Sequence, residues 1–316
     1  MHNSKISIII PTFNEEKNLP ACLDSLLKID YPDESIEIIV VDNGSTDRTR
    51  EIADQFRVKL FRDDSKNVSG LRNLGVAKST GAIIAFIDAD CVASEDWLNN
   101  AAVYFNDSKI AAWGAPPEVP ANGTWVQKTW HVVRSKGKNL AEVDWLESMN
   151  LFVRKKQFLE IGGFNESLIT CEDVDLSYRI KKLGKIISDN RIQVFHYGEA
   201  ATVRQFISKE VWRGIGNFKG VFSHGIRLKE LPSLMIPLYF GVFIPFNLIV
   251  FLITGNAGWL VVLIMFYIIP TLLVLAKILS KTKSNCSFLM NLSLLLQFYF
   301  FARTYAIFQR RYWKQK

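Results

Sequence analysis

The first hundred residues of the chain alternate short apolar runs with stretches of helical periodicity. Strands are predicted over Ile6–Pro11, Ile36–Val41, Val58–Phe61 and Ala82–Ile87. Helices are predicted over Glu15–Lys28, over Thr46–Phe56 with Ser45 as its N-cap, and over Gly70–Lys78. Strands with Ile and Val on both faces, alternating with helices, are typical of a parallel sheet covered on both sides. The pattern therefore predicts an α/β fold.

Between residues 111 and 199, strand and helix patterns no longer alternate regularly. The sequence predicts a strand over Glu147–Val153, a helix over Glu172–Leu183 that ends before Gly184, and a short strand over Gln193–His196. Residues 201–231 then combine basic and apolar side chains at helical spacing. This segment predicts one or two amphipathic helices on a membrane surface, and a core-facing helix is the alternative.

Long apolar stretches dominate the last third of the chain. Ser233–Ile253 and Ala257–Leu279 carry no charge before Lys277, and about 20 residues suffice to cross a bilayer core. A third stretch, Phe288–Phe301, is shorter, and it either extends to Phe308 or lies along the interface. We therefore expect an α/β domain over residues 1–200, an interface segment over 201–231, and a membrane domain over 232–316 with two to three helices.

The charge pattern favours a membrane over nucleic acid as the partner. The chain has 38 Lys and Arg against 31 Asp and Glu, a net charge of +7, and the basic residues gather beside the late apolar stretches. No signal-peptide pattern opens the chain, and Lys277, Lys281 and Lys283 follow the second apolar stretch. These features predict a multi-pass protein of the cell's inner membrane whose first half is cytoplasmic.

The four cysteines are scattered, without a Cys-x-x-Cys pair. Their spacing argues against a zinc cluster and favours a reducing compartment, while a disulfide stays open.

Polar clusters follow three of the predicted strands. They are Pro11-Thr12-Phe13-Asn14-Glu15, Asp42-Asn43-Gly44-Ser45 and Asp88-Ala89-Asp90. The carboxyl ends of parallel strands form one edge, where ligands of such sheets bind. Asp88 and Asp90 are hard ligands suited to Mg²⁺ or Mn²⁺, which bind diphosphates, although a plain turn is the alternative. The first strand is followed by no Gly-x-Gly-x-x-Gly, and the chain has no P-loop, so both of those nucleotide-binding classes are excluded.

Four motifs in order then identify a family. Pro11-Thr12-Phe13-Asn14-Glu15-Glu16, Val40 to Asp47, Leu71-Arg72-Asn73-Leu74-Gly75 and Phe86 to Asp90 together resemble the family-two glycosyltransferases of the GT-A fold, over about residues 5–200. The membrane tail is similar to that of enzymes that build bacterial exopolysaccharide, O-antigen or other lipid-linked glycans. The resemblance implies a Rossmann-like, mostly parallel catalytic domain that uses a nucleotide-diphosphate sugar.

The resemblance also implies roles for single residues at the donor end. Pro11, Thr12, Asn14 and Glu15 would line the nucleotide pocket, and Asp88 would face the nucleotide. Asp42 would accept a hydrogen bond from the base, which favours a UDP or dTDP sugar. Arg72 would lie near the base or phosphates, unless it is a surface charge. Asp90, with Asp88 and His196, would hold the metal, unless His196 is structural.

A second acidic pair, Glu172-Asp173, begins a predicted helix, where acidic residues are also common as caps. The resemblance, with Gly162-Gly163-Phe164 upstream, implies that Asp173 is the general base and that Glu172 raises its pKa. It also implies that Asn150 lies beside the donor sugar and acceptor, whereas a turn residue at a strand end is the alternative.

These assignments predict inverting, metal-dependent transfer of a sugar to a membrane-presented acceptor, a polyprenyl-linked saccharide. The alternatives are a polyprenyl-phosphate sugar synthase and a non-catalytic scaffold or sugar-nucleotide sensor. The Gln-x-x-Arg-Trp motif of processive polymerases is missing around Trp212 and Arg213, so we expect one sugar per encounter.

Overall fold

The computed structural model describes residues 4–134, 139–224, 235, 239–279 and 285–308. The chain forms two compact units. The first comprises Met1–Ala121 and Lys136–Glu199, and the second comprises Asn122–Ser135 and Ala200–Lys316. The short segment Asn122–Ser135 belongs to the second unit, which the sequence does not indicate.

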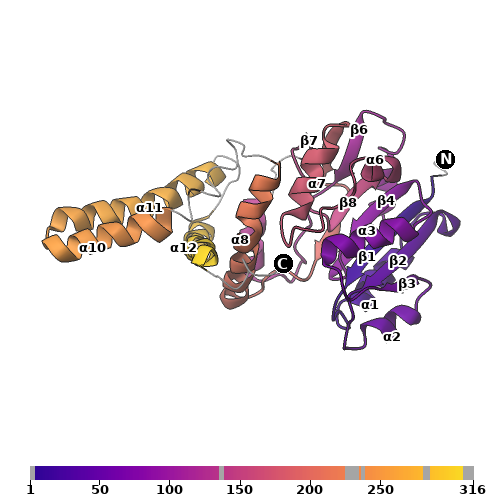
Figure 1. Cartoon of the computed structure of the whole chain (residues 1–316), viewed down its shortest axis with the longest axis horizontal. Helices are drawn as coiled ribbons and strands as arrows, with labels where there is room; N and C mark the ends of the chain where they lie inside the picture. The colour runs from indigo at the N-terminus through magenta and orange to yellow at the C-terminus, as the bar shows by residue number, and fades with distance from the viewer. Residues whose placement is uncertain (1–3, 135–138, 225–234, 236–238, 280–284, 309–316) are drawn as a thin grey trace. The chain divides into compact units, whose positions relative to one another are not determined.

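The first unit is built on one large sheet (Figure 1). Its strands are β1 (Ile6–Thr12), β2 (Ile36–Asp42), β3 (Lys59–Arg62), β4 (Ile83–Ile87), β6 (Ile110–Gly114), β7 (Leu140–Glu142), β8 (Asn150–Arg154) and β9 (Lys185–Asp189). They lie in the order β3-β2-β1-β4-β8-β6-β9-β7. β1 to β4 are mutually parallel, whereas β8 runs antiparallel to β4 and β6. The short strands β5 (Cys91–Ala93) and β10 (Val194–His196) form a separate antiparallel pair.

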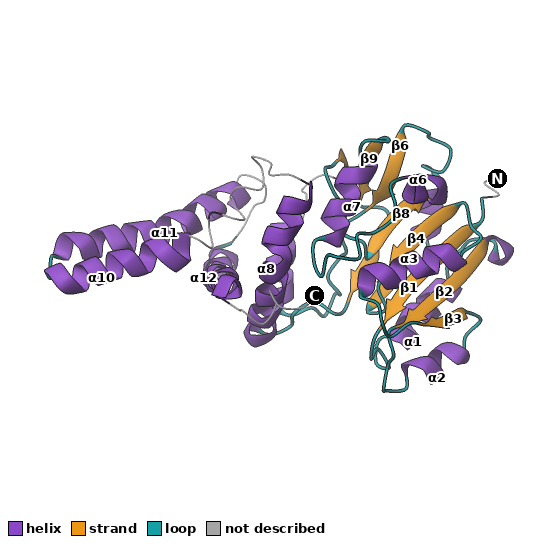
Figure 2. Cartoon of the chain, viewed as in Figure 1, coloured by secondary structure: helices purple, strands orange, loops and turns teal. Residues whose placement is uncertain are grey.

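Helices cover both faces of this sheet (Figure 2). The helices of the unit are α1 (Leu19–Leu27), α2 (Thr49–Asp54), α3 (Val68–Lys78), α4 (Trp97–Ala102), α6 (Lys155–Glu160) and α7 (Glu172–Ile180), with a 3₁₀ turn at Asp33–Ser35. Ile8 and Ile10 pack with α1, α2 and α4, while the intervening Ile9 packs with α3, α6 and α7. Apolar residues on both strand faces are thus buried, as the sequence predicts.

The register of the parallel strands places the polar clusters together. Thr12 at the end of β1 lies opposite Asp42 at the end of β2. β4 pairs with β1 on its other side and ends at Ile87, directly before Asp88. The three polar clusters therefore share the carboxyl edge of the sheet.

Two predicted helices begin later than expected. α1 begins at Leu19 because residues 15–18 form a turn in which the Leu19 N–H donates to the Glu15 carbonyl. α2 begins at Thr49, and the Ser45 side chain donates to Asp42 instead of capping a helix. Side chains of the neighbouring loop accept from the backbone N–H groups of both segments, since the Glu15 N–H donates to Thr49 Oγ1 and the Thr46 N–H donates to Asn14 Oδ1.

The second unit is helical. Its elements are α5 (Trp125–Arg134), α8 (Val203–His224), a π-helical turn at Tyr239–Phe243, α10 (Ile244–Thr254), α11 (Ala257–Leu279) and α12 (Cys286–Phe308). Trp130 of α5, Phe206 of α8 and Phe300 of α12 meet in one apolar cluster. Beside it, the buried Glu210 accepts hydrogen bonds from Arg213 at 2.6 Å and Arg303 at 2.9 Å, which joins α8 to α12.

Two described helices are long and apolar enough to cross a membrane, over Ala257–Ala276 and Cys286–Ala306. The third predicted stretch forms the helix Cys286–Phe308, which agrees with the alternative that extends to Phe308. The first stretch is a shorter apolar helix over Tyr239–Thr254, and the start of the predicted range at Ser233 lies outside the described residues. α10 and α11 form an antiparallel pair joined at Gly255, which has a φ of +62° (Figure 1).

Candidate active site

A cavity of about 200 Å³ opens at the carboxyl edge of the parallel strands. Its walls come from the segments after β1, β2 and β4 and from the start of α3. The lining residues are Pro11, Thr12, Phe13, Glu15, Asn43, Val68, Leu71, Asp88, Ala89 and Asp90. The structure thus brings together Pro11, Thr12, Glu15, Asp88 and Asp90, which the sequence predicts as donor-site residues.

Asn14 supports the cavity without lining it. Its backbone is left-handed, with a φ of +55°, a conformation that Asn tolerates better than most residues. Its backbone N–H donates to Ser45 Oγ at 2.9 Å, and its side-chain oxygen accepts from the Thr46 N–H at 2.9 Å. Asn14 therefore joins the segments that follow β1 and β2.

Asp42 is fully buried and held from both sides of its carboxylate. One oxygen accepts from the Ser45 N–H at 2.9 Å and lies 3.9 Å from Arg50 Nε, and the other accepts from the Ser45 hydroxyl. The neighbouring Asn43, not Asp42, lines the cavity. The Asp42 carboxylate, which the resemblance expects to accept a hydrogen bond from the nucleobase, is fully buried and is not among the residues that line this cavity.

Three carboxylates converge on the cavity. Desolvation raises the pKa of Glu15, a hydrogen bond from Asn18 opposes the shift, and the negative charges of Asp90 and Asp88 raise the pKa further. Asp88 and Asp90 keep 26% and 20% of their side-chain surface exposed. Carboxylates held this close repel one another, and a cation between them relieves the repulsion.

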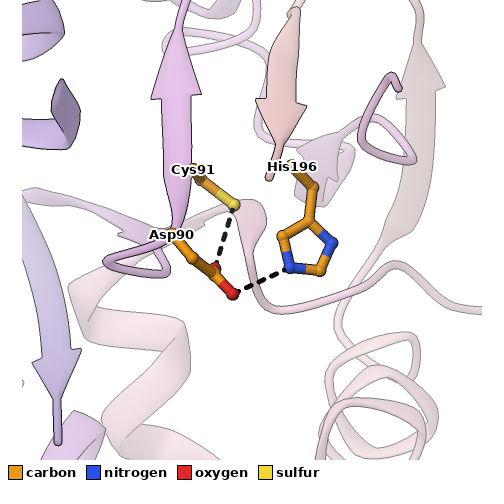
Figure 3. A group of neighbouring side chains, drawn as sticks. All are labelled: Asp90, Cys91 and His196. Atoms are coloured by element: carbon orange, nitrogen blue, oxygen red, sulfur yellow. Dashed lines mark hydrogen bonds and ion pairs between the residues drawn. The ribbon is translucent and has the colours of Figure 1, made fainter. Parts of the chain in front are cut away.

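His196, at the end of β10, faces Asp90 (Figure 3). Its Nε2 lies 3.1 Å from Asp90 Oδ2, and its Nδ1 lies 3.4 Å from Glu199. Burial alone lowers the pKa of His196, but hydrogen bonding to Asp90 and Glu199 raises the pKa to about 9. A second carboxylate behind a histidine is the arrangement that orients metal-binding imidazoles.

The donor set at this corner fits a hard divalent cation. Ligand atoms of Asp90, Cys91 and His196 lie within 4.8 Å of one another. Burial, followed by the charges of Asp90 and Asp88, raises the pKa of the Cys91 thiol, and hard cations seldom take sulfur ligands. Carboxylate and imidazole ligands remain, and these suit Mn²⁺ or Mg²⁺ better than a soft metal.

Gly198 leaves space around the same atoms. A Cβ at this position would overlap Asp90 Oδ2 and lie 2.9 Å from His196 Nε2. The φ of Gly198 lies outside the left-handed region, so the backbone itself accepts Ala. Because Gly198 has no side chain, the space beside the Asp90 carboxylate stays open.

We expect Gly198→Ala to weaken Mn²⁺ binding by about 10–100-fold, the usual effect of disturbing the surroundings of metal ligands. The added methyl pushes the Asp90 carboxylate away from His196. Titration calorimetry with MnCl₂ measures the change, and Tyr197→Phe is the control because half of that neighbouring side chain is exposed. Equal Mn²⁺ affinity in Gly198→Ala and the wild type would show that metal binding does not depend on the open space at Gly198.

Arg72 lies between the cavity and the second acidic pair. Its guanidinium donates to Asp88 Oδ1 at 2.7 Å and to Glu172 Oε1 at 3.0 Å, and only 3% of the side chain is exposed. It is therefore not the surface charge considered as the alternative, and it is not open to the base or phosphates, which the resemblance implies as its neighbours.

The next residue, Asn73, holds the Gly162-Gly163-Phe164 segment. Its side-chain amide donates to the Phe164 carbonyl and accepts from the Phe164 N–H, both at 2.9 Å. Gly163 has a φ of +69°, and a Cβ there would lie 2.6 Å from Asn73 Oδ1. This contact places the Phe164 ring 5.4 Å from the Arg72 guanidinium carbon.

Asp173 has the electrostatics of a general base. Desolvation, followed by the charges of Glu172 and Glu147, raises the pKa of Asp173 to about 7. The preceding Cys171 is left-handed, with a φ of +65°, a costly conformation for a side chain of its size. The expected effect of Glu172 on the Asp173 carboxyl is present, and a pKa near 7 suits proton abstraction.

The sequence comparison decides the family. Residues 7–164, half of the chain, match the family described as "Glycosyl transferase family 2". The chain belongs to this family. Glycosyltransferase AglE of Haloferax volcanii is 32% identical over 57% of this chain and 62% of its own length. The O-antigen chain rhamnosyltransferase RfbN of Salmonella typhimurium is 34% identical over the same shares. The chain thus spans about three fifths of the length of both relatives.

Solved structures agree on the fold of this family-2 chain. The mannosyltransferase PcManGT of Pyrobaculum calidifontis, in complex with GDP-Man and Mn²⁺, has a TM-score of 0.66 at 18% identity. The match covers 98% of this chain and 89% of PcManGT, so it includes helices of the second unit. The GT-A fold predicted from the four motifs is confirmed.

Asn150 has a different environment from the one that the resemblance implies. The side chain is fully buried, accepts from Trp97 Nε1 at 2.9 Å, and donates to the carbonyls of Ala115 at 3.0 Å and Ile192 at 2.8 Å. These bonds hold the start of β8 against two loops. The geometry therefore gives Asn150 a role in the fold of this family-2 domain, rather than a contact with sugar.

Four residues beside the candidate site receive no role in the sequence-based predictions: Asn73, Glu147, Gly198 and Glu199. Glu147 is buried and acts on Asp173 across a long sequence separation. Gly198 and Glu199 follow the His196 strand end, and a glycine directly beyond a predicted ligand was the signal available for them.

Proposed function

We propose that this family-2 chain transfers a sugar from a nucleotide-diphosphate donor to an acceptor at a membrane, with inversion at the anomeric carbon. The observation that carries the proposal is the convergence of Glu15, Asp88 and Asp90 on one cavity, with His196 beside Asp90. A cavity lined with carboxylates repels a bare diphosphate, so the arrangement needs a cation that both sides share.

Asp88, Asp90 and His196 would hold Mg²⁺ or Mn²⁺, which supplies positive charge for the leaving diphosphate. The PcManGT complex with Mn²⁺ supports this assignment through the shared fold. Pro11, Thr12 and Glu15 form the wall against which the nucleotide lies. Because Asp42 is buried and does not line the cavity, the expected preference for UDP or dTDP sugars over GDP sugars rests on the resemblance alone.

Asp173 accepts the proton of the acceptor hydroxyl as that oxygen attacks the anomeric carbon from the face opposite the diphosphate. One displacement at that carbon inverts its configuration. With a pKa of about 7, the carboxylate is present at neutral pH and is more basic than an ordinary Asp. Glu172 and Glu147 maintain this basicity by their charge.

The acceptor that we propose is a polyprenyl-linked saccharide, reached from the cytoplasmic side of the inner membrane. The two candidate spans and the exposed apolar surface of α10 and α11 support membrane attachment. In the same unit, α5 exposes Trp125 and Lys128, and α8 exposes Arg204 and Trp212. Tryptophan beside basic side chains is typical of helices at a membrane interface.

We expect the full-length protein to remain in the membrane pellet after carbonate washing and to need detergent for release. The apolar surface of α10, α11 and α12 would otherwise face water. Immunoblotting of the fractions is the measurement, with a known peripheral protein as the control for the wash. Recovery of the chain in the carbonate supernatant would contradict attachment through these helices.

The function is tested by incubating the purified full-length protein and MnCl₂ with radiolabelled UDP, dTDP and GDP sugars. The acceptors are lipid extracts from cells that lack the protein. We expect label in the lipid fraction, and mass spectrometry then identifies the product. A product with one sugar on polyprenyl phosphate would favour the synthase alternative. Nucleotide binding without transfer from any donor would favour the scaffold or sensor.

A further inference from the structure

Arg72 connects two motifs that lie far apart in the sequence. Asp88 is 16 residues from Arg72, and Glu172 is 100 residues from it. One guanidinium nitrogen donates to each carboxylate, at 2.7 Å and 3.0 Å. Asp88 lines the proposed donor cavity, and Glu172 begins the helix that carries Asp173. The arginine therefore spans the donor end and the base end of the site.

The surroundings restrain this guanidinium. The Phe164 ring lies on one side of it at 5.4 Å, and Asn73 holds the Phe164 backbone by two hydrogen bonds. Nε is buried without a hydrogen-bond partner among the described residues. Burial alone lowers the pKa of Arg72, but the charges of Asp88 and Glu172 raise it. A buried, stacked arginine with two carboxylate partners has little freedom to move.

We propose that Arg72 is a positioning residue that ties Glu172 to Asp88 and so sets the Asp173 base at a fixed place relative to the donor. The inference rests on the proposed function and replaces the expected contact of Arg72 with phosphates. Lysine cannot perform this task, because its single ammonium lacks the planar fork that reaches two carboxylates at once. Loss of the contacts between Arg72 and the two carboxylates should therefore lower turnover more than it weakens donor binding.

The first experiment needs no activity. Thermal melting is measured for the full-length wild type, Glu172→Gln, Arg72→Met and the double variant Arg72→Met with Glu172→Gln. With Arg72 present, Glu172→Gln removes an ion-pair partner and should lower Tm. With Met at position 72, the same change removes an unpaired buried charge and should raise Tm. If Glu172→Gln lowers Tm equally with Arg and with Met at position 72, the proposed link between Arg72 and Glu172 is wrong.

The second experiment is kinetic and compares Arg72→Lys with the wild type on the donor that the transfer assay identifies. We expect turnover to fall about tenfold to a hundredfold, as misplaced reacting groups typically cause, with donor KM within about threefold of the wild type. Arg57→Lys is the control, since Arg57 is exposed. Folded protein is quantified by its melting amplitude.

A raised donor KM with normal turnover would instead place Arg72 on the donor and overturn the proposal. Loss of activity only in proportion to unfolded protein would overturn it as well, because that outcome describes a purely structural residue. If the wild type transfers no sugar at all, the proposed function fails, and the melting experiment still decides whether Arg72 pairs with Glu172.

Discussion

Asp173→Asn is expected to lower turnover by about 10²–10⁴-fold, the range that general-base assistance supplies. Asn keeps the size of the side chain but cannot accept the proton of the acceptor hydroxyl. Nucleotide-sugar affinity should stay close to that of the wild type, because Asp173 belongs to the base end of the site. Steady-state kinetics with saturating donor and acceptor measures the loss, and Asp24→Asn on the exposed side of α1 is the matched control.

The pH dependence should follow the same carboxyl. Because its pKa in the folded protein is about 7, wild-type turnover should rise through neutral pH and then level off. An Asp whose folded pKa is raised stabilises the fold at low pH, and this contribution is lost as pH rises through about 7. The Tm of Asp173→Asn relative to the wild type should therefore be higher at pH 8 than at pH 4.

The outcomes separate the possible roles of Asp173. An unfolded Asp173→Asn variant would mean that the residue is structural. A folded variant with near-normal turnover would mean that the acceptor needs no base, as an already ionised polyprenyl phosphate would not. That result would move the assignment to the polyprenyl-phosphate sugar synthase.

Asp90→Ala is expected to abolish the response of transfer to Mn²⁺ or Mg²⁺ and to leave the protein folded. Loss of several kcal/mol of charge stabilisation corresponds to roughly a hundredfold to a thousandfold in rate. The Asp90 carboxylate sits at the end of the sheet and is partly exposed, so its removal disturbs little packing. Activity is measured across a MnCl₂ series after treatment with EDTA.

Glu95→Ala is the control for Asp90→Ala, because Glu95 is exposed and follows β5, the strand that begins directly after Asp90. Calorimetry with MnCl₂ adds a measurement that does not depend on catalysis. Full transfer by the wild type in excess EDTA would contradict a metal at Asp90, and so would unchanged Mn²⁺ affinity in Asp90→Ala.

A local sequence pattern predicts the environment of Asp88 but not that of Asn150. Asp88 directly follows a run of six apolar residues that predicts a buried strand. Because this strand is parallel to β1, Asp88 lies at the carboxyl edge of the sheet. Asn150 also begins a strand, but its partners are Trp97, Ala115 and Ile192, which a local pattern cannot identify. Its environment depends on which loops meet at the end of β8.

The sequence by itself determined the α/β class, the parallel strands β1 to β4 and the shared edge of their polar clusters, since strand period and strand-end polarity are encoded by near neighbours. Only the tertiary structure decided that Arg72 joins Asp88 to Glu172, that Glu147 acts on Asp173, and that Asn122–Ser135 belongs to the helical unit. These contacts join residues distant in the chain, and they exist because buried charges must find partners wherever the packed elements place them.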